Sequence, residues 1–203
     1  RCRDIALVTR DLSAYTGILD AALERERIPF YLDRRDSILT DPLITLTLAA
    51  LRAATDGYAT DDLLTLLKTG LSGFSTSSIS LVENYVFLWR INGARWRQEW
   101  TWNPEGLSVQ ATEKTDKQLA HLNRLRRRLI RPLERLQTAL SGHPTGADFA
   151  HAVYRYLLEI HADRLVRLQV ARLDAAGEHA LADRQARLWD VLMNLLDKFA
   201  TAL

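Results

Sequence analysis

The segment 115–140 constrains the fold most, because its leucines recur every three or four residues. This spacing places them on one face of a single helix, and the segment therefore predicts a helix from about Thr115 to Leu140. Pro132 is expected to bend or divide that helix. The leucines that share the face are Leu122, Leu125, Leu129, Leu133, Leu136 and Leu140.

Arginines in the same segment also step by three and four, and a helical wheel puts them on the opposite face. Glu134 is the only acid between Lys117 and Arg135. We favour a solvated outer face, and the alternative is a ridge that contacts phosphates, because regularly spaced guanidinium groups suit a polyanion. The arginines of this face are Arg124, Arg128, Arg131 and Arg135, and Arg126 and Arg127 add charge at its flanks.

The rest of the chain after residue 40 also predicts helices. The sequence is 47% hydrophobic, which is ample for a core. We expect a mainly α fold, with a multi-helix domain over residues 41–203. Besides the long helix, the expected helices cover about 42–54, 61–69, 78–91, 147–160, 163–175 and 178–200.

The first forty residues predict a different unit, a strand–helix–strand. The apolar run Ile5–Thr9 predicts a strand, residues 13–27 predict a helix, and "IPFYLD" predicts a second strand. A βαβ crossover of this size makes the two strands parallel. Because two parallel strands alone are not a stable sheet, we expect further strands outside this chain, which would be a piece of a larger protein.

Composition and motif searches exclude several classes of function. The net charge of +2 does not by itself imply a nucleic-acid partner, and a single cysteine, Cys2, excludes a disulfide or a cysteine-based metal cluster within the chain. The sequence has no GxxxxGK[ST] or GxGxxG fingerprint and no metal-binding histidine spacing. No apolar stretch approaches the roughly 20 residues of a membrane span, so we expect a cytoplasmic location and no membrane partner.

The stretch "WRINGARWRQEWTW" interleaves four tryptophans with three arginines. Such residues can stack on single-stranded bases while pairing with phosphates. We favour the other interpretation, in which the tryptophans fasten a loop onto the helices. The residues are Trp89, Trp96, Trp100 and Trp102 with Arg90, Arg95 and Arg97.

Several of these segments together resemble a known family. "DIALVTRDLSAYTGILDAALERERIPFYLDRR" followed by "DPL" resembles the start of domain 2A of UvrD-like superfamily 1 helicases, and "LLKTGL" and "LVENYVFLWRINGARW" narrow the resemblance. They are similar to AddB (RexB), the B subunit of the bacterial AddAB/RexAB-type ATP-dependent helicase/deoxyribonuclease. The resemblance implies that residues 1–40 begin a helicase-like domain 2A and that residues 41–203 form the inserted helical domain 2B.

The resemblance also implies a function in DNA double-strand-break repair, with two partners: DNA and AddA, the helicase–nuclease subunit of the heterodimer. ATP, Mg²⁺ and an iron–sulfur cluster are implied for the parent complex, and no cofactor is expected in this fragment, which should have no catalytic activity of its own. Arg10 stands at the motif IV position, which implies contact with a nucleotide phosphate; an exposed arginine at a strand end is the alternative. The candidate DNA-binding residues are Arg124, Arg128, Arg131, Arg135, Lys68, Arg95 and Trp96.

Two rival interpretations stay open at this point. The helices could form a scaffold that does not contact DNA, with the arginine face in solvent or against acidic residues of AddA. The chain could also be the 2B region of an active UvrD-type helicase.

Overall fold

The computed structural model describes residues 5–15, 17–31 and 38–202. Internal contacts divide the chain into two units, Arg1–Ile38 and Leu39–Leu203, and each has an architecture of its own. The predicted assignment of residues 1–40 and 41–203 to helicase domains 2A and 2B stays a prediction.

The described residues of the first unit contain no strand, so the predicted βαβ arrangement is wrong for this structure. The unit has one 3₁₀ turn, Ser13–Tyr15, and one short helix, α1 (Leu19–Arg25). Val8, in the first predicted strand, is 94% exposed, and Ile28–Tyr31 in the second is irregular. Residues 32 and 33 of that second strand lie outside the described residues. A strand requires neighbouring backbone for its hydrogen bonds, and the described residues supply none.

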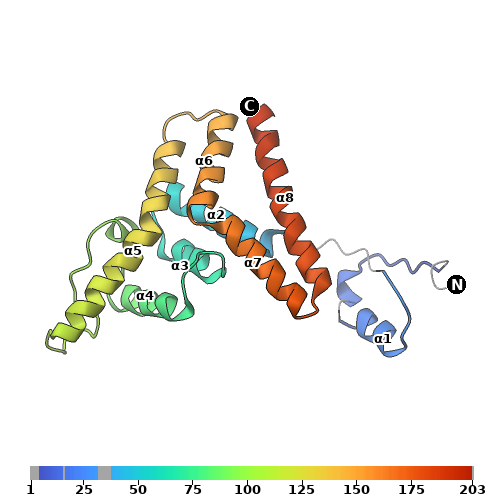
Figure 1. The fold of residues 1–203 in the computed structure, drawn as a ribbon, viewed down its shortest axis with the longest axis horizontal. Helices are drawn as coiled ribbons and strands as arrows, with labels where there is room; N and C mark the ends of the chain where they lie inside the picture. Colours follow the sequence, from blue (N-terminus) through green and yellow to red (C-terminus); the bar gives the residue numbers. More distant parts are fainter. Residues whose placement is uncertain (1–4, 16, 32–37, 203) are drawn as a thin grey trace. The chain divides into compact units, whose positions relative to one another are not determined.

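The second unit is helical, as the sequence pattern predicts. The predicted bounds differ from the observed ones by at most three residues. One helix continues through Pro132, so it is not divided there, and the predicted bend stays a prediction. Figure 1 shows the helices in chain order. They are α2 (Pro42–Thr55), α3 (Thr60–Lys68), α4 (Thr76–Leu88), α5 (Glu113–Leu140), α6 (Gly146–Glu159), α7 (Ala162–Ala175) and α8 (His179–Ala202).

Several of these helices begin at a polar side chain that caps the free backbone N–H groups. Asp41 accepts a hydrogen bond from the Leu43 N–H at the start of α2, with Pro42 as the first helical residue. The α5 and α6 helices both begin with a capping box, formed by Thr112 at α5 and by Thr145 at α6. These caps fix where the helices start, and their hydrophobic faces then determine how they pack.

The core of the second unit lies where α2, α3, α5 and α6 meet. Ala49, Ala50 and Ala53 of α2 are at most 1% exposed, and such small side chains allow α3 to approach closely. Leu122 and Leu133 of α5 are fully buried in the same cluster. The α5 helix contacts α2, α4 and α6, and α8 packs against α6 and α7. In Figure 1, α7 and α8 form a helical hairpin.

None of the described helices is both long enough and apolar enough to cross a bilayer.

Asn123 of α5 holds the loop that follows α4 by two hydrogen bonds to one residue. Its Oδ1 accepts from the Trp100 N–H at 3.0 Å, and its Nδ2 donates to the Trp100 carbonyl at 2.8 Å. Both residues are buried, at 4% and 2% exposed. A buried backbone N–H or carbonyl that has no hydrogen-bond partner destabilises the fold by its full desolvation cost. The Asn123 side chain therefore stabilises the fold by bonding to both groups of Trp100.

We expect Asn123→Ala to lower the free energy of unfolding by about 2–4 kcal/mol, because it leaves the Trp100 N–H and carbonyl buried without partners. Urea unfolding followed by far-UV circular dichroism measures the change. The matched control is Asn194→Ala, at an exposed position of α8, which should change the free energy by no more than about 0.5 kcal/mol. Equal effects of the two changes would refute the role of Asn123.

Candidate nucleic-acid interface

The α5 helix separates leucines from arginines around its axis. Five of the six leucines are buried, and Leu140 at the end of the helix is half-buried. The predicted division of the helix into an apolar and a charged face is therefore confirmed. The four arginines predicted on the other face, Arg124, Arg128, Arg131 and Arg135, are all exposed.

Arg126 departs from the predicted arrangement, because it is only 6% exposed and belongs to the core. Its Nη1 donates to the Trp96 carbonyl at 3.0 Å, and its Nε donates to the Asn123 Oδ1 at 3.2 Å. Burial lowers the pKa of the Arg126 guanidinium. The position explains the difference: at about 100° per residue, Arg126 lies about 60° from the centre of the leucine stripe, whereas Arg131 lies about 160° away.

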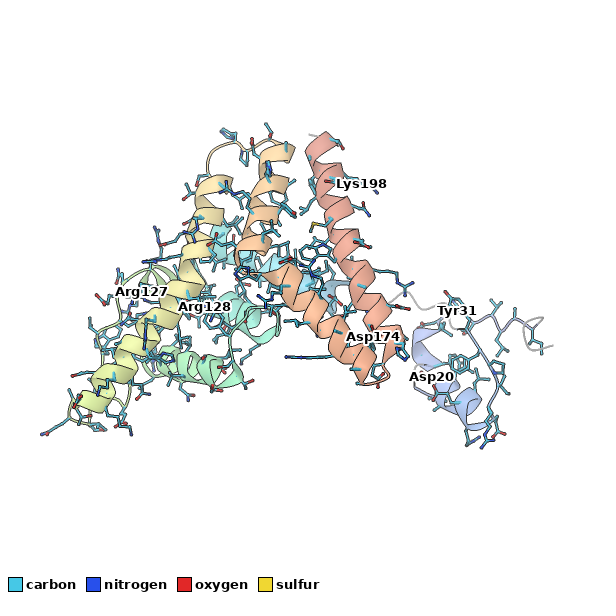
Figure 2. The ribbon with its side chains drawn as sticks, in the orientation of Figure 1. Asp20, Tyr31, Arg127, Arg128, Asp174 and Lys198 are labelled. Atoms are coloured by element: carbon cyan, nitrogen blue, oxygen red, sulfur yellow. The ribbon has the colours of Figure 1, made fainter. Side chains whose placement is uncertain are left out.

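Arginines of α5 line a pocket of about 460 Å³, which we call the arginine pocket. Its other walls come from the connection between α3 and α4, through Ser72 and Phe74, and from the end of α6, through Tyr156 and Glu159. Figure 2 shows Arg127 and Arg128 projecting from α5. The arginines of the pocket are Arg124, Arg127, Arg128, Arg131 and Arg135, and Glu159 is the only carboxylate among its described lining residues.

Two of these arginines are held in place by the pocket walls. The Arg128 Nη2 donates to the Gly73 carbonyl at 2.8 Å, and the guanidinium lies 4.7 Å from the centre of the Phe74 ring. Gly73 has a φ of +72°, and a Cβ there would stand 3.0 Å from the Arg128 Nη2, so glycine is favoured on both grounds. Arg135 pairs through its Nε and Nη2 with the carboxylate of Glu159.

The remaining three arginines keep their hydrogen-bonding groups available. Arg124, Arg127 and Arg131 make no hydrogen bond or ion pair with another residue that the structure describes. Carbonyl and aromatic partners do not neutralise Arg128 either, since neither carries a net negative charge. The pocket therefore holds a large excess of positive charge in a concave space.

The other predicted DNA-binding residues do not join this pocket. Lys68 on α3 pairs with Glu83 of α4, and the Arg95 guanidinium lies 5.6 Å from the centre of the Trp102 ring. Both side chains are exposed, but neither lines the arginine pocket. Arg10 is exposed in the first unit, and its predicted contact with a nucleotide stays a prediction.

The tryptophans following α4 form an internal cluster, as favoured from the sequence. Trp100 stacks on Tyr85 with ring centres 4.7 Å apart and meets Trp96 edge-on at 5.3 Å, while Trp89 stacks on Trp102 at 5.2 Å. Three of their N–H groups bond within the protein: Trp96 donates to the Thr60 hydroxyl, Trp89 to the Asn103 carbonyl and Trp100 to the Arg95 carbonyl.

Trp96 has no exposed surface, so its predicted contact with DNA is incompatible with this structure. The Thr60 hydroxyl, which receives the Trp96 N–H, donates in turn to the Ile91 carbonyl at 2.6 Å. The ring is therefore a core side chain. Its neighbours Arg95 and Arg97 are exposed, because the tight 3₁₀ turn Gly93–Trp96 points adjacent side chains in different directions.

Sequence reasoning missed the wall of the pocket that faces α5. Phe74 comes from the connection between α3 and α4, Glu159 and His161 come from the end of the next helix, α6, and from the turn after it, and nothing in their own sequence context indicates a site. Only tertiary packing, such as that of α6 against α5, brings them together.

Comparison with known proteins finds relatives that all carry the same name. The chain is 29% identical over 200 residues, 97% of its length, to the B subunit of the ATP-dependent helicase/deoxyribonuclease of Ruminiclostridium cellulolyticum. The B subunits of the same name from Clostridium novyi and Clostridioides difficile are 29% and 28% identical over 98% of the chain. The resemblance to the AddB family is confirmed.

The similarity to AddB extends over nearly the whole chain, including the helices after residue 100, which lie beyond the motifs quoted from the sequence. The chain spans 17% of the length of these AddB relatives. No family model matches it.

We expect Trp96→Ala to lower the free energy of unfolding by about 3–5 kcal/mol, because it empties a fully buried site and removes the partner of the Thr60 hydroxyl. Chemical denaturation followed by circular dichroism measures the loss. The control is Trp102→Ala, whose ring is 39% exposed and whose main loss is one stacking contact, about 0.5–1.5 kcal/mol. A small effect at Trp96 would contradict its assignment to the core.

Proposed function

We propose that this chain contacts the phosphate backbone of DNA through the arginine pocket, as part of a protein of the AddB type. The observation that carries the proposal is the gathering of five arginines in one concave space with one carboxylate among the described lining residues. A solvated outer face, the interpretation favoured from the sequence, would place these groups on a convex surface. Their convergence on a hollow favours a bound polyanion instead.

Guanidinium groups suit this role because their planar forks match the oxygens of a phosphate. Charge-assisted hydrogen bonds of this kind are roughly twice as strong as neutral ones. Contacts to phosphate position a protein on nucleic acid without reading its sequence, so the pocket would hold DNA of any sequence. The chain then contributes binding to the parent protein and leaves catalysis to other parts.

The relatives support this context, since their names describe an ATP-dependent helicase and deoxyribonuclease. We propose that this chain is part of such a protein and that the protein acts in DNA double-strand-break repair. Its partner would be AddA, the helicase–nuclease subunit of the heterodimer. Residues 1–40 would begin domain 2A and residues 41–203 would form domain 2B. A cytoplasmic location is part of the same proposal.

The cofactors implied for the parent complex would bind outside this chain. One cysteine, Cys2, which lies outside the described residues, cannot supply the four thiolates of an iron–sulfur cluster. The described residues bring together no group of three or more His, Cys, Asp or Glu that could hold a metal ion. We therefore assign the cluster and Mg²⁺ to the rest of the parent protein, which would also supply the site for ATP, with Arg10 as the one predicted contact from this chain.

Exposed apolar side chains favour a second candidate function, a scaffold that packs against other parts of the complex. Phe87 and Leu88 at the end of α4 are 59% and 50% exposed, and Val191 and Leu195 on α8 are each 46% exposed. The last two are four residues apart and therefore share one face of α8. In this alternative, the arginines would lie in solvent or against acidic residues of AddA.

A salt titration distinguishes the two functions. We expect Arg124→Gln combined with Arg131→Gln to weaken binding of labelled oligonucleotides, measured by fluorescence anisotropy at several salt concentrations. The slope of log K against log salt should flatten by about 0.7 per lost contact for single strands and about 0.9 for duplex. These two arginines are chosen because they make no hydrogen bond or ion pair with the described residues, so their loss should leave the fold intact.

The matched control combines Arg172→Gln with Arg187→Gln, which removes two exposed arginines of α7 and α8 outside the pocket. The control should keep the slope of the unchanged chain. No binding by the unchanged chain, or equal slopes for the two double variants, would refute contact through the pocket and favour the scaffold.

A further inference from the structure

Glu159 occupies an unusual position for a carboxylate. It is the last residue of α6, where the partial negative charge of the helix disfavours another negative group. Arg135 compensates for this position by pairing with both carboxylate oxygens through Nε and Nη2. The pair has the two-pronged geometry that an arginine also makes with a phosphate.

The pair is accessible to a competing anion. The Arg135 side chain is 62% exposed and the Glu159 side chain is 32% exposed. Water reaches both partners, so the pair is weaker than a buried one, and an incoming phosphate can take the same two-pronged place on Arg135 that the carboxylate occupies. Arg131, one turn away on α5 and without an ion pair in the described part of the chain, would hold the neighbouring phosphate.

A second pocket, of about 740 Å³, begins on the other side of this pair. It lies between the end of α5 and α6, and it shares Pro132, Arg135, Tyr156 and Glu159 with the arginine pocket. The two hollows therefore meet at the Arg135–Glu159 pair.

The second pocket is lined by as many acids as arginines among the described residues, with Asp148 and Glu159 beside Arg135 and Arg155. The Arg155 side chain is exposed. Asp148 is engaged in capping α6, since its Oδ2 accepts hydrogen bonds from the Thr145 N–H at 3.0 Å and from the Thr145 hydroxyl at 2.7 Å. Glu159 is therefore the acid that stands between the arginines of the arginine pocket and Arg155.

The dimensions favour a single strand of nucleic acid over a duplex. Packed helices lie about 8–10 Å apart, so the hollow between α5 and α6 is narrow beside a B-DNA duplex, whose major groove alone is about 12 Å wide. The rise from Arg124 to Arg135 along α5 is about 16 Å. A single strand with an extended backbone covers this distance with only a few nucleotides, since its phosphates lie farther apart than the roughly 3.4 Å rise of one strand along a duplex axis.

We propose that the Arg135–Glu159 pair is a displaceable barrier on one continuous track for a single strand. A phosphate replaces Glu159 on Arg135, and the strand continues from the arginine pocket into the second pocket, where Arg155 contacts it. The proposal rests on the proposed function of the arginine pocket and adds two residues to it. Glu159 opposes binding, and Arg155 extends the contact.

Glu159→Gln tests the barrier, because it removes the competing charge and keeps the size of the side chain. The affinity for a 20-nucleotide single strand should rise about two- to fivefold, which corresponds to the energy of an exposed ion pair. The salt slope should steepen by about 0.7, for one added phosphate contact. Glu159→Asp, which keeps the charge, should bind like the unchanged chain.

The matched control is Glu134→Gln, which removes an acid of α5 that pairs with Arg97 and lines neither pocket. It should raise the affinity less than Glu159→Gln and leave the salt slope unchanged. Equal effects of the two changes would overturn the barrier and leave only a general effect of net charge.

Arg155→Gln tests the second half of the track. It should weaken binding of the 20-nucleotide strand and leave unchanged the binding of a trinucleotide, measured by competition, because the trinucleotide is short enough to lie within the arginine pocket alone. Equal weakening of both strands, or of neither, would overturn the extension.

The outcomes separate this inference from the proposed function. If the unchanged chain binds through Arg124 and Arg131 but Glu159→Gln gives no increase, the barrier fails and the proposed function stands. If the chain does not bind DNA, the proposed function itself fails. If Glu159→Gln strengthens duplex binding and not single-strand binding, the assignment of a single strand is overturned.

Discussion

Burial of the leucine face of α5 is the constraint on which the second unit depends. The helix contacts α2, α4 and α6, so its leucines belong to the same core as the alanines of α2. A helix that buries one face cannot rotate about its own axis. The arginines of α5 are therefore held on the side opposite the core. The basic pocket is a consequence of this packing, because the same helix that supplies the core also presents the charge.

Polar groups then fix the loop between α4 and α5 against that helix. Asn123 bonds to both backbone groups of Trp100, and Arg126 bonds to the Trp96 carbonyl. These residues replace the regular backbone pairing that a loop lacks, and the stacked rings exclude water around them. The result is a loop rich in arginine and tryptophan whose aromatic rings stabilise the fold, while most of its charges remain in water.

The sequence predicted the helices of the second unit well because each one repeats apolar residues at helical spacing, and several begin at a capping side chain. It failed for the first unit, where strands at Ile5–Thr9 and after Ile28 were expected from apolar residues alone. A strand depends on a partner, and no local pattern states whether one is present. Arg126 was placed at the flank of the charged face although its spacing puts it about 60° from the centre of the leucine stripe, and the Trp96 carbonyl that receives it could not be read from spacing. The arginines of the pocket could be predicted from their spacing. The place of Glu159 and Phe74 in the pocket could not, because it depends on how other segments pack against α5.

The continuity of α5 through Pro132 has a mechanical consequence. Its 28 residues correspond to a rod of about 42 Å, with the tryptophan loop fastened along its first half and α6 packed against it. A force on the arginines would be transmitted along this helix to both attachments, and Pro132, which lacks the N–H that would bond to the Arg128 carbonyl, is the point at which the helix can bend. Movement of a bound strand and displacement of α5 would then be coupled, so that the helix would act as a lever between the strand and the core.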